Sequence, residues 1–102
     1  MYVLELIDAI DDLAHEAKPV PLSDRVRVDR AELESLIGAL REEVARFRRS
    51  HDALALVGEL ETIVREAGPI PLTGRIRVER EVVYAILDRL RVTIPELVRE
   101  TP

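Results

Sequence analysis

A twelve-residue segment occurs twice in this chain, and this repeat restricts the possible folds more than any other feature. Residues 19–30 read PVPLSDRVRVDR, and residues 69–80 read PIPLTGRIRVER, 50 positions later. All differences between the copies are conservative except Asp24 to Gly74, a turn position that suits either residue. A repeat unit of this length predicts two equivalent units, residues 1–50 and residues 51–102, which share one core.

Apolar residues with helical spacing flank each copy of the segment. The first stripe predicts a helix over residues 2–17, which ends before a proline. The second stripe runs from Leu33 to Phe47 and predicts a helix over residues 30–47, with Asp29 as its N-cap. The same stripes return in the second half. There Pro95 interrupts the last one, so we expect the final helix to kink or restart near Thr93.

A short strand is predicted inside each copy, because arginine and β-branched residues alternate strictly over residues 25–28 and 75–78. A lone strand of this length needs a partner, and the nearest one is the strand of the other copy. Antiparallel pairing within the chain gives a mainly α fold with a short β ribbon. It is a tandem helix–strand–helix repeat that forms a pseudo-two-fold intramolecular dimer. Pairing of the same strands between two chains is the alternative.

In this arrangement the strand residues divide by face. The apolar side chains point inward and form the pairing core, and the arginines point outward. The predicted pairing and interaction residues are Val26, Val28, Ile76, Val78, Arg25, Arg27, Arg75 and Arg77.

Composition narrows the function classes. The net charge of −5 disfavours a general nucleic-acid or membrane-surface binder. Cysteine is absent, which removes disulfides and thiolate metal sites. No signal peptide is readable, and no apolar run reaches the roughly 20 residues of a membrane helix. We therefore expect a soluble cytoplasmic protein without membrane insertion.

No group of residues predicts a catalytic, metal-binding or phosphate-binding site. His15 and His51 occupy non-equivalent repeat positions, whereas a metal site needs three or four converging ligands. Asp8, Asp11 and Asp12 are spaced like a solvated helix face, and no glycine spacing fits a phosphate loop. We expect no enzyme activity, no cofactor, no metal and no small-molecule substrate.

The four strand arginines also allow a different function. In ribbon-helix-helix repressors a two-stranded ribbon enters the DNA major groove and its outward side chains read bases. A strand followed by two helices fits that order. The acidic charge of the chain favours a solvated ribbon face instead, because groove readers are usually basic.

Two other groups of residues are candidate partner-binding surfaces. Leu22 and Leu72 lie in the proline-rich segments, and we expect them to pack over the helices; a partner site is the alternative. The basic cluster at the end of the second helix is expected to be solvated, or to meet an acidic partner. It consists of Arg41, Arg46, Arg48 and Arg49.

The chain also resembles a known family. The matching features are Met1-Tyr2 before an acidic helix, residues 66–74 (EAGPIPLTG), residues 77–80 (RVER), residues 86–91 (ILDRLR) and Ile94-Pro95-Glu96. They are similar to the N-terminal head of SepIVA and DivIVA-like bacterial coiled-coil proteins, often labelled ATP synthase subunit b-like. Here the head is duplicated and the coiled coil is missing.

The resemblance implies a protein of bacterial cell division or envelope growth that acts by dimerisation and partner binding. It implies no catalytic residues. Together with the repeat, it predicts a non-enzymatic protein–protein interaction and oligomerisation module, which binds a protein partner or itself. A ribbon-helix-helix-like DNA-binding regulator is the alternative.

Overall fold

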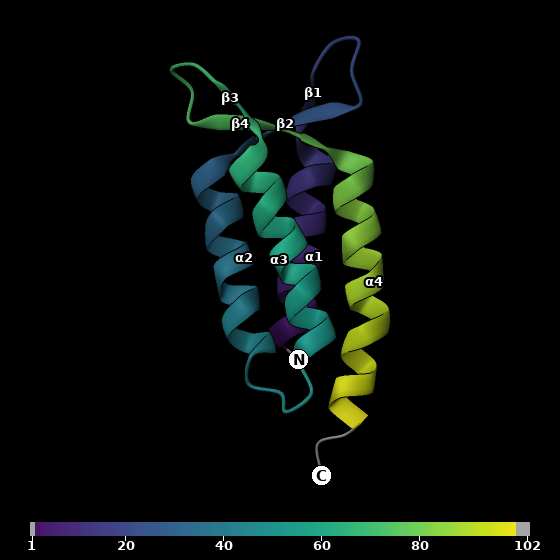
Figure 1. Ribbon diagram of the computed structural model, residues 1–102. Helices are drawn as coiled ribbons and strands as arrows, with labels where there is room; N and C mark the ends of the chain where they lie inside the picture. Colours follow the sequence, from purple (N-terminus) through teal and green to yellow (C-terminus); the bar gives the residue numbers. More distant parts are fainter. Residues whose placement is uncertain (1, 100–102) are drawn as a thin grey trace.

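Four helices stand side by side in this protein, and a small sheet covers one end of them (Figure 1). The computed structural model describes residues 2–99, and the side chains of residues 3–95. The helices are α1 (Tyr2–Glu16), α2 (Arg30–Val44), α3 (His51–Glu66) and α4 (Arg80–Arg99). The predicted mainly helical fold is confirmed.

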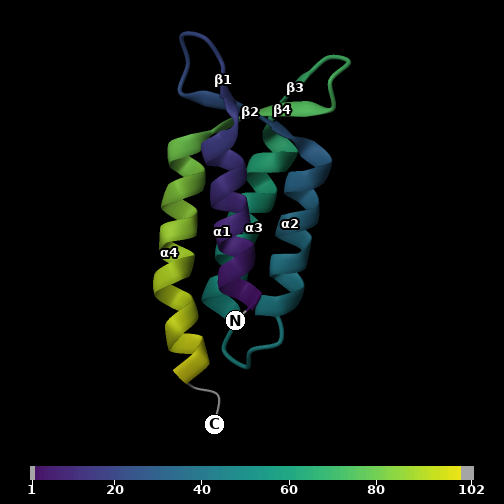
Figure 2. The same ribbon diagram turned by 180° about the vertical axis from the view of Figure 1, so that it is seen from behind.

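The helices form a ring in which each contacts two neighbours. α1 packs against α2 and α4, and α3 packs against the same two helices. α3 is therefore in front in Figure 1, and α1 is in front when the molecule is seen from behind in Figure 2. The bundle measures 48 × 20 × 19 Å, with the sheet at one end of the long axis.

The sheet has four antiparallel strands in the order β1-β2-β4-β3. They are β1 (Lys18–Pro19), β2 (Arg25–Asp29), β3 (Gly68–Ile70) and β4 (Arg75–Glu79). The prediction of one strand in each half was wrong, because each half contributes a hairpin and has the order helix–hairpin–helix. The prolines of β1 and β3 are tolerated because both strands lie at the edges of the sheet.

The two central strands pair within one chain. Val26 lies opposite Val78, and Val28 lies opposite Ile76. All four side chains are buried and point toward the bundle. They belong to a single apolar cluster that includes buried residues of all four helices. The side chain of Leu97, which the predicted stripe includes, lies outside the described residues.

The ends of the helices agree with the predictions only in part. The side chain of Asp29 accepts a 2.9 Å hydrogen bond from the Glu32 backbone N–H, which confirms the predicted N-cap. α2 ends at Val44, earlier than predicted, because the backbone N–H groups of Arg46 and Phe47 bond three residues back and tighten the chain into a turn.

The final helix was expected to kink or restart near Thr93, but it does not restart. The backbone is helical from Arg80 to Arg99 with Pro95 inside it. The Thr93 hydroxyl donates to the Arg89 carbonyl at 2.9 Å instead of starting a new helix. Pro95 removes one backbone bond, and it does so close to the end of the helix, where few later turns depend on it.

Candidate functional site

The outer face of the sheet presents the four predicted arginines to solvent. Along β2 and β4, exposed and buried residues alternate, so every arginine is exposed and every intervening apolar residue is buried. Arg27 lies directly opposite Arg77, and Lys18 lies next to Arg27 on the edge strand. Paired residues share a face of a sheet. Three cations therefore form a row across its outer surface.

These arginines are only partly neutralised. Arg25 lies opposite Glu79, and Arg75 lies opposite Asp29. Within the described part of the chain, however, none of the four strand arginines forms a salt bridge. Like charges directly opposite one another destabilise a sheet. The Arg27–Arg77 pair therefore brings no local stability.

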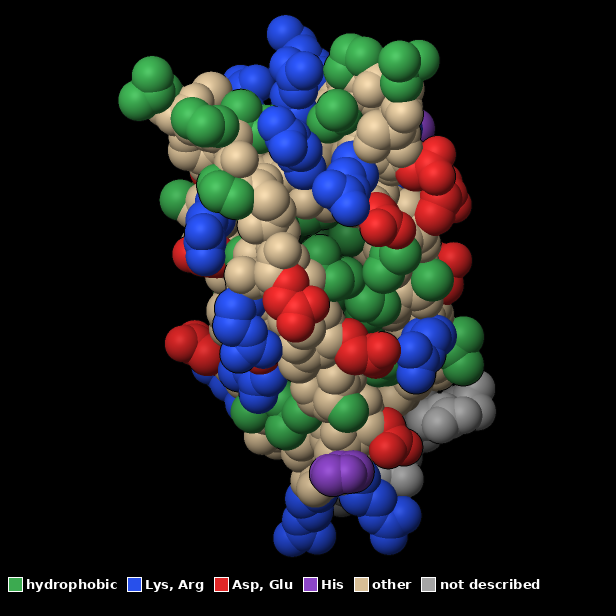
Figure 3. All heavy atoms as spheres, turned by 45° about the horizontal axis from the view of Figure 1, so that its top comes forward, with side chains coloured by type: hydrophobic (Ala, Val, Ile, Leu, Met, Phe, Trp, Pro, Cys, Tyr) green, Lys and Arg blue, Asp and Glu red, His purple; other side chains and the backbone are tan. Residues whose placement is uncertain are grey.

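The loops of the two hairpins project beyond the sheet, and each has a leucine in it. Leu22 and Leu72 have relative exposures of 108% and 107%. The expectation that they pack over the helices was wrong, because both loops leave the bundle and neither leucine has a surface to cover (Figure 1). With the sheet end tilted toward the viewer, hydrophobic side chains of the two hairpins flank a row of Lys and Arg side chains (Figure 3).

Both leucines adopt an unusual backbone conformation. Their φ angles are 61° and 66°, in the left-handed region that costs an ordinary L-residue about 1–2 kcal/mol. In the second loop the Thr73 N–H donates to the Ile70 carbonyl at 3.3 Å, with Pro71 and Leu72 as the central residues of the turn. Proline followed by a positive φ is the pattern of a type II turn, whose second central position usually holds glycine or asparagine.

Hydroxyl groups hold the loops in place. The Ser23 hydroxyl accepts a 2.9 Å hydrogen bond from the Arg25 N–H, and the Thr73 hydroxyl accepts one of 3.1 Å from the Arg75 N–H. We call the leucine tips, the cationic row and the two further strand arginines together the sheet-end surface. It consists of Lys18, Leu22, Arg25, Arg27, Leu72, Arg75 and Arg77.

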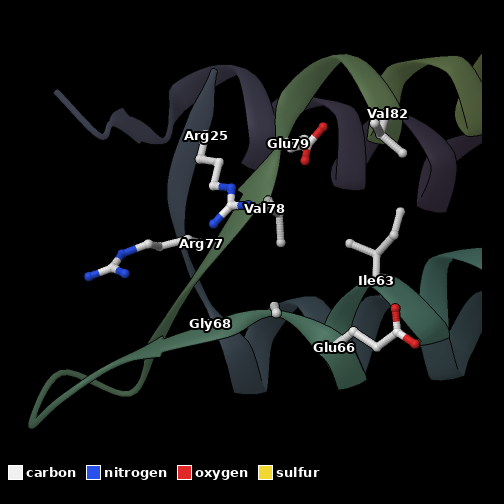
Figure 4. Close-up of a pocket in the computed structure, with 9 residues that line it drawn as sticks. Arg25, Ile63, Glu66, Gly68, Arg77, Val78, Glu79 and Val82 are labelled. Atoms are coloured by element: carbon white, nitrogen blue, oxygen red, sulfur yellow. The ribbon is translucent and has the colours of Figure 1, made fainter. Parts of the chain in front are cut away.

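Two small hollows lie beside the sheet. The β4 hollow has a volume of about 230 Å³ and lies between β4, α3 and α4. Figure 4 shows Arg25 and Arg77 on its strand side and Ile63 and Val82 on its helix side. The β2 hollow, of about 340 Å³, is lined by the nine residues that correspond to these at the 50-residue offset. Each hollow has arginines and carboxylates in its walls.

Two of the ion-pair groups that connect the helices lie at positions that correspond in the two halves. Arg41 of α2 binds both carboxylate oxygens of Glu61 of α3, one of them at 2.9 Å. Arg91 of α4 binds Asp11 at 2.7 Å and Asp8 at 3.0 Å, both on α1. The residues at the 50-residue offset from Arg41 and Glu61 are Arg91 and Asp11.

The shifted pKa values belong to these ion pairs. Hydrogen bonds from Arg41 lower the pKa of Glu61, and the same bonds raise the pKa of Arg41, with burial acting in the opposite direction on each. Hydrogen bonds to Asp11 and Asp8 raise the pKa of Arg91. These pKa shifts therefore arise from the ion pairs that connect the helices.

Glu61→Gln is expected to reduce the acid sensitivity of the fold. Because the folded pKa of Glu61 lies below its ordinary value of 4.5, the pair stabilises the protein above that value, and the contribution disappears as the pH falls through the folded pKa. The side chains of Arg41 and Glu61 are 41% and 39% exposed, so the contribution is below about 1 kcal/mol.

Urea unfolding at neutral pH and at a pH below the ordinary glutamate value measures this effect. The free energy of unfolding of Glu61→Gln should change less between the two conditions than that of the parent. Glu59→Gln is the matched control, since Glu59 pairs with Arg89 only at 3.4 Å on the surface. Equal pH dependence of the parent and Glu61→Gln would contradict the prediction.

The remaining candidate residues lie apart. His15 contacts the Tyr84 hydroxyl at 3.4 Å, and His51 begins α3 at the other end of the bundle. Among the described residues, no three histidine, aspartate or glutamate side chains converge as metal ligands. None of the described helices is long and apolar enough to cross a membrane.

Arginines of the basic cluster at the end of α2 interact with other groups of the protein. Arg41 binds Glu61 of α3, and Arg46 binds Glu43 at 3.3 Å. Arg49 also takes part in an interaction within the protein. The cluster is therefore a weaker candidate for an acidic partner than the strand arginines, whose charges lack such partners among the described residues.

Comparisons of the chain with protein-family models, with curated proteins and with solved structures found no match. The resemblance to the septation-linked coiled-coil proteins therefore stays a prediction. The function has to be inferred from the surfaces of the molecule.

Proposed function

We propose that this protein is a non-enzymatic interaction module that binds a protein partner through its sheet-end surface. The observation that carries the proposal is the pair of leucines at the hairpin tips. Leu22 and Leu72 are fully exposed, and both have a positive φ. The same residue in the same conformation occurs in both halves.

Neither leucine contributes to the stability of the free protein. A leucine at positive φ costs about 1–2 kcal/mol, and a side chain left in water brings no burial in return. Glycine or asparagine fits this turn position better. Burial of a leucine side chain in a partner stabilises a complex by about 1.5–3 kcal/mol. A pair of exposed leucines is therefore useful for binding and unfavourable for folding.

The arginines favour a partner with acidic groups. Arg27 and Arg77 are opposed across the central strands, and an acidic partner relieves their repulsion. Arginine also binds carboxylates through two parallel hydrogen bonds, which adds direction to the contact. The partner surface is expected to carry apolar pockets for two leucines with acidic residues between them.

We further propose that the two halves are related by a pseudo-two-fold axis through the Arg27–Arg77 pair. Three observations support it: the strand register, in which Arg25 and Arg75 lie opposite Glu79 and Asp29; the corresponding ion pairs of Arg41 and Arg91; and the corresponding linings of the β2 and β4 hollows. Such an axis offers two equal half-sites to a partner that is itself a symmetric dimer.

DNA binding is the second candidate, favoured by the four exposed arginines. The sheet argues against insertion in the manner of a ribbon-helix-helix protein. Four strands spaced about 4.8 Å apart put the outer strands about 14 Å from each other, whereas the major groove is about 12 Å wide. Duplex binding that falls steeply with salt and is lost in Arg27→Ala/Arg77→Ala would favour DNA over a protein partner.

The biological setting is proposed from the resemblance alone. SepIVA and DivIVA-like proteins imply a cytoplasmic role in bacterial cell division or envelope growth. A duplicated head fits an adaptor that binds such an assembly.

A random-peptide phage library tests the protein-binding function. The library is selected on the parent protein and on the Leu22→Asn/Leu72→Asn variant. We expect acidic peptides with apolar residues to be enriched on the parent and to lose binding on the variant. Enrichment of the same peptides on both proteins, or no enrichment on either, would contradict the proposal.

The variant is also expected to be more stable than the parent. Asparagine adopts a positive φ more readily than leucine, so each exchange should stabilise the fold by up to about 1 kcal/mol. Thermal melting by circular dichroism measures the change. Leu4→Asn is the matched control, because Leu4 is 39% exposed on α1 and asparagine weakens a helix. A lower melting temperature for the loop variant would show that the leucines support the fold.

A further inference from the structure

A groove runs along the bundle between α3 and α4. It consists of a lower hollow of about 540 Å³ near Val92, a middle hollow of about 590 Å³, and the β4 hollow. The lower and middle hollows share Ala55 and Glu59, and the middle and β4 hollows share Ile63 and Val82. The groove therefore extends from the end of the bundle away from the sheet up to the sheet itself. Figure 3 shows hydrophobic side chains on this side of the molecule.

The groove differs in the placement of its charges from the corresponding side formed by α1 and α2. At six lining positions, a carboxylate in the first half corresponds to a small or apolar residue in the second half. The exchanges are Glu5 to Ala55, Asp8 to Gly58, Asp12 to Thr62, Glu32 to Val82, Glu42 to Val92 and Glu43 to Thr93. Val82 and Val92 remain 42% and 70% exposed. Two valines thus lie in water at the two ends of one groove.

The charges that line the groove differ between its ends. The lower hollow has three carboxylates, Asp52, Glu59 and Asp88, and one arginine, Arg89. In the first half the residues that correspond to these carboxylates are uncharged. The β4 hollow at the other end includes Arg25 and Arg77 together with two glutamates. The groove therefore has an acidic end and an end that contains arginine.

We propose that the α3–α4 groove is covered by the same groove of a second copy of this chain, in an antiparallel arrangement. Antiparallel packing brings each Val82 against Val92 of the other copy, because the two residues lie at opposite ends of the groove. It also brings the acidic lower hollow of one copy against Arg25 and Arg77 of the other. Parallel packing would oppose three carboxylates to three carboxylates, which is unfavourable.

The area available predicts a weak dimer. α3 is about 24 Å long and two packed helices are about 20 Å wide, so each copy can bury roughly 500 Å². The total of about 1,000 Å² is at the lower limit for a specific interface. We therefore expect association that depends on concentration, with a dissociation constant in the micromolar range or weaker.

The dimer would double the number of partner-binding surfaces in one assembly. This consequence rests on the proposed binding of a partner at the sheet-end surface. Antiparallel packing places the leucine tips of the two sheet-end surfaces at opposite ends of the assembly, while Arg25 and Arg77 of each copy contact the other copy. One dimer then binds two partners and holds them apart, so the module acts as a bridge.

Cysteine cross-linking tests the geometry directly, since the chain contains no native cysteine. Val82→Cys and Val92→Cys proteins, one of them tagged, are oxidised separately and as a mixture. We expect a mixed disulfide in the mixture and little cross-linking in either protein alone. The two positions are about 15 Å apart along α4, whereas a disulfide requires Cα atoms within about 7 Å. Equal or greater cross-linking within each single variant would overturn the antiparallel arrangement.

Sedimentation equilibrium on the unmodified chain tests the association itself. The mean mass should rise from that of the monomer toward twice that value as the concentration increases to the millimolar range. Val82→Glu/Val92→Glu, which introduces the residues of the first half, should remain folded and stay monomeric. Leu22→Asn/Leu72→Asn should still dimerise, which separates this interface from the leucine tips of the sheet-end surface. A monomer at every concentration would overturn the proposal, and so would an unchanged dimer of the glutamate variant.

Discussion

Val78→Asp is expected to unfold the protein or to lower its melting temperature by roughly 15–30 °C, whereas Arg77→Asp, one residue earlier, leaves it folded. Val78 is 3% exposed and lies opposite Val26 over the end of the bundle. An aspartate there is a buried charge without a partner and costs about 3–5 kcal/mol. A domain of this size has only about 5–15 kcal/mol of stability in total.

Arg77→Asp is the matched control, because it introduces the same side chain on the same strand. Arg77 points to solvent opposite Arg27, so aspartate replaces a repulsive pair with an attractive one. The melting temperature should stay the same or rise slightly. Thermal and urea unfolding of both variants measure the difference. If Val78→Asp melted with the parent, β4 would not pack on the helices.

The central strands and the helices could be predicted because their periodicity extends over enough residues. The alternation in β2 and β4 is strict, and it correctly places Val26 inside and Arg27 outside. The N-cap of α2 was also readable, because Asp29 precedes a helical stripe and Glu32 follows three residues later. In each case the local pattern and the tertiary packing favour the same structure.

The edge strands could not be predicted in the same way. β1 has two residues and β3 has three, which is too few for an alternating pattern. Each includes a proline, which usually argues against a strand. They exist because β2 and β4 offer free edges to the segments that fold back beside them. This is a tertiary effect that the residues of β1 and β3 do not encode alone.

The leucine tips were predicted wrongly because hydrophobic residues are expected to be buried. Leu22 and Leu72 follow prolines, and the turn at that point has a central position with positive φ. The sequence signal was the retention of leucine in both copies. That both loops leave the bundle (Figure 1) is a tertiary property, which the residues of the loops do not encode alone.

The exchanges along the α3–α4 groove were visible as sequence differences between the halves. Glu32 to Val82 and Glu42 to Val92 are isolated surface changes when read along the chain. Only the helix packing shows that both valines line one groove. The 50-residue spacing of the repeat identifies which positions correspond in the two halves. The helix packing is needed to show that the exchanged positions lie in the same groove.

Leu40→Ala and Leu90→Ala are expected to destabilise the protein by about 3–4 kcal/mol each, within the range for buried leucines. The two leucines correspond at the 50-residue offset, on α2 and α4, and both are 0% exposed. They belong to the single apolar cluster that includes both halves. Because the cost of a cavity depends on its surroundings, equivalent surroundings predict similar losses. Leu4→Ala, at a position 39% exposed, is the control and should cost less than about 1.5 kcal/mol.

The number of unfolding transitions tests whether the two halves share one core. If the halves share one core, each variant melts in a single transition, and its calorimetric and van't Hoff enthalpies agree. If each half were stable by itself, Leu40→Ala would lower the melting of residues 1–50 alone and leave a second transition unchanged. Differential scanning calorimetry separates these outcomes. A single transition lowered equally by both variants would mean that neither half folds without the other, so the two leucine tips are always presented together.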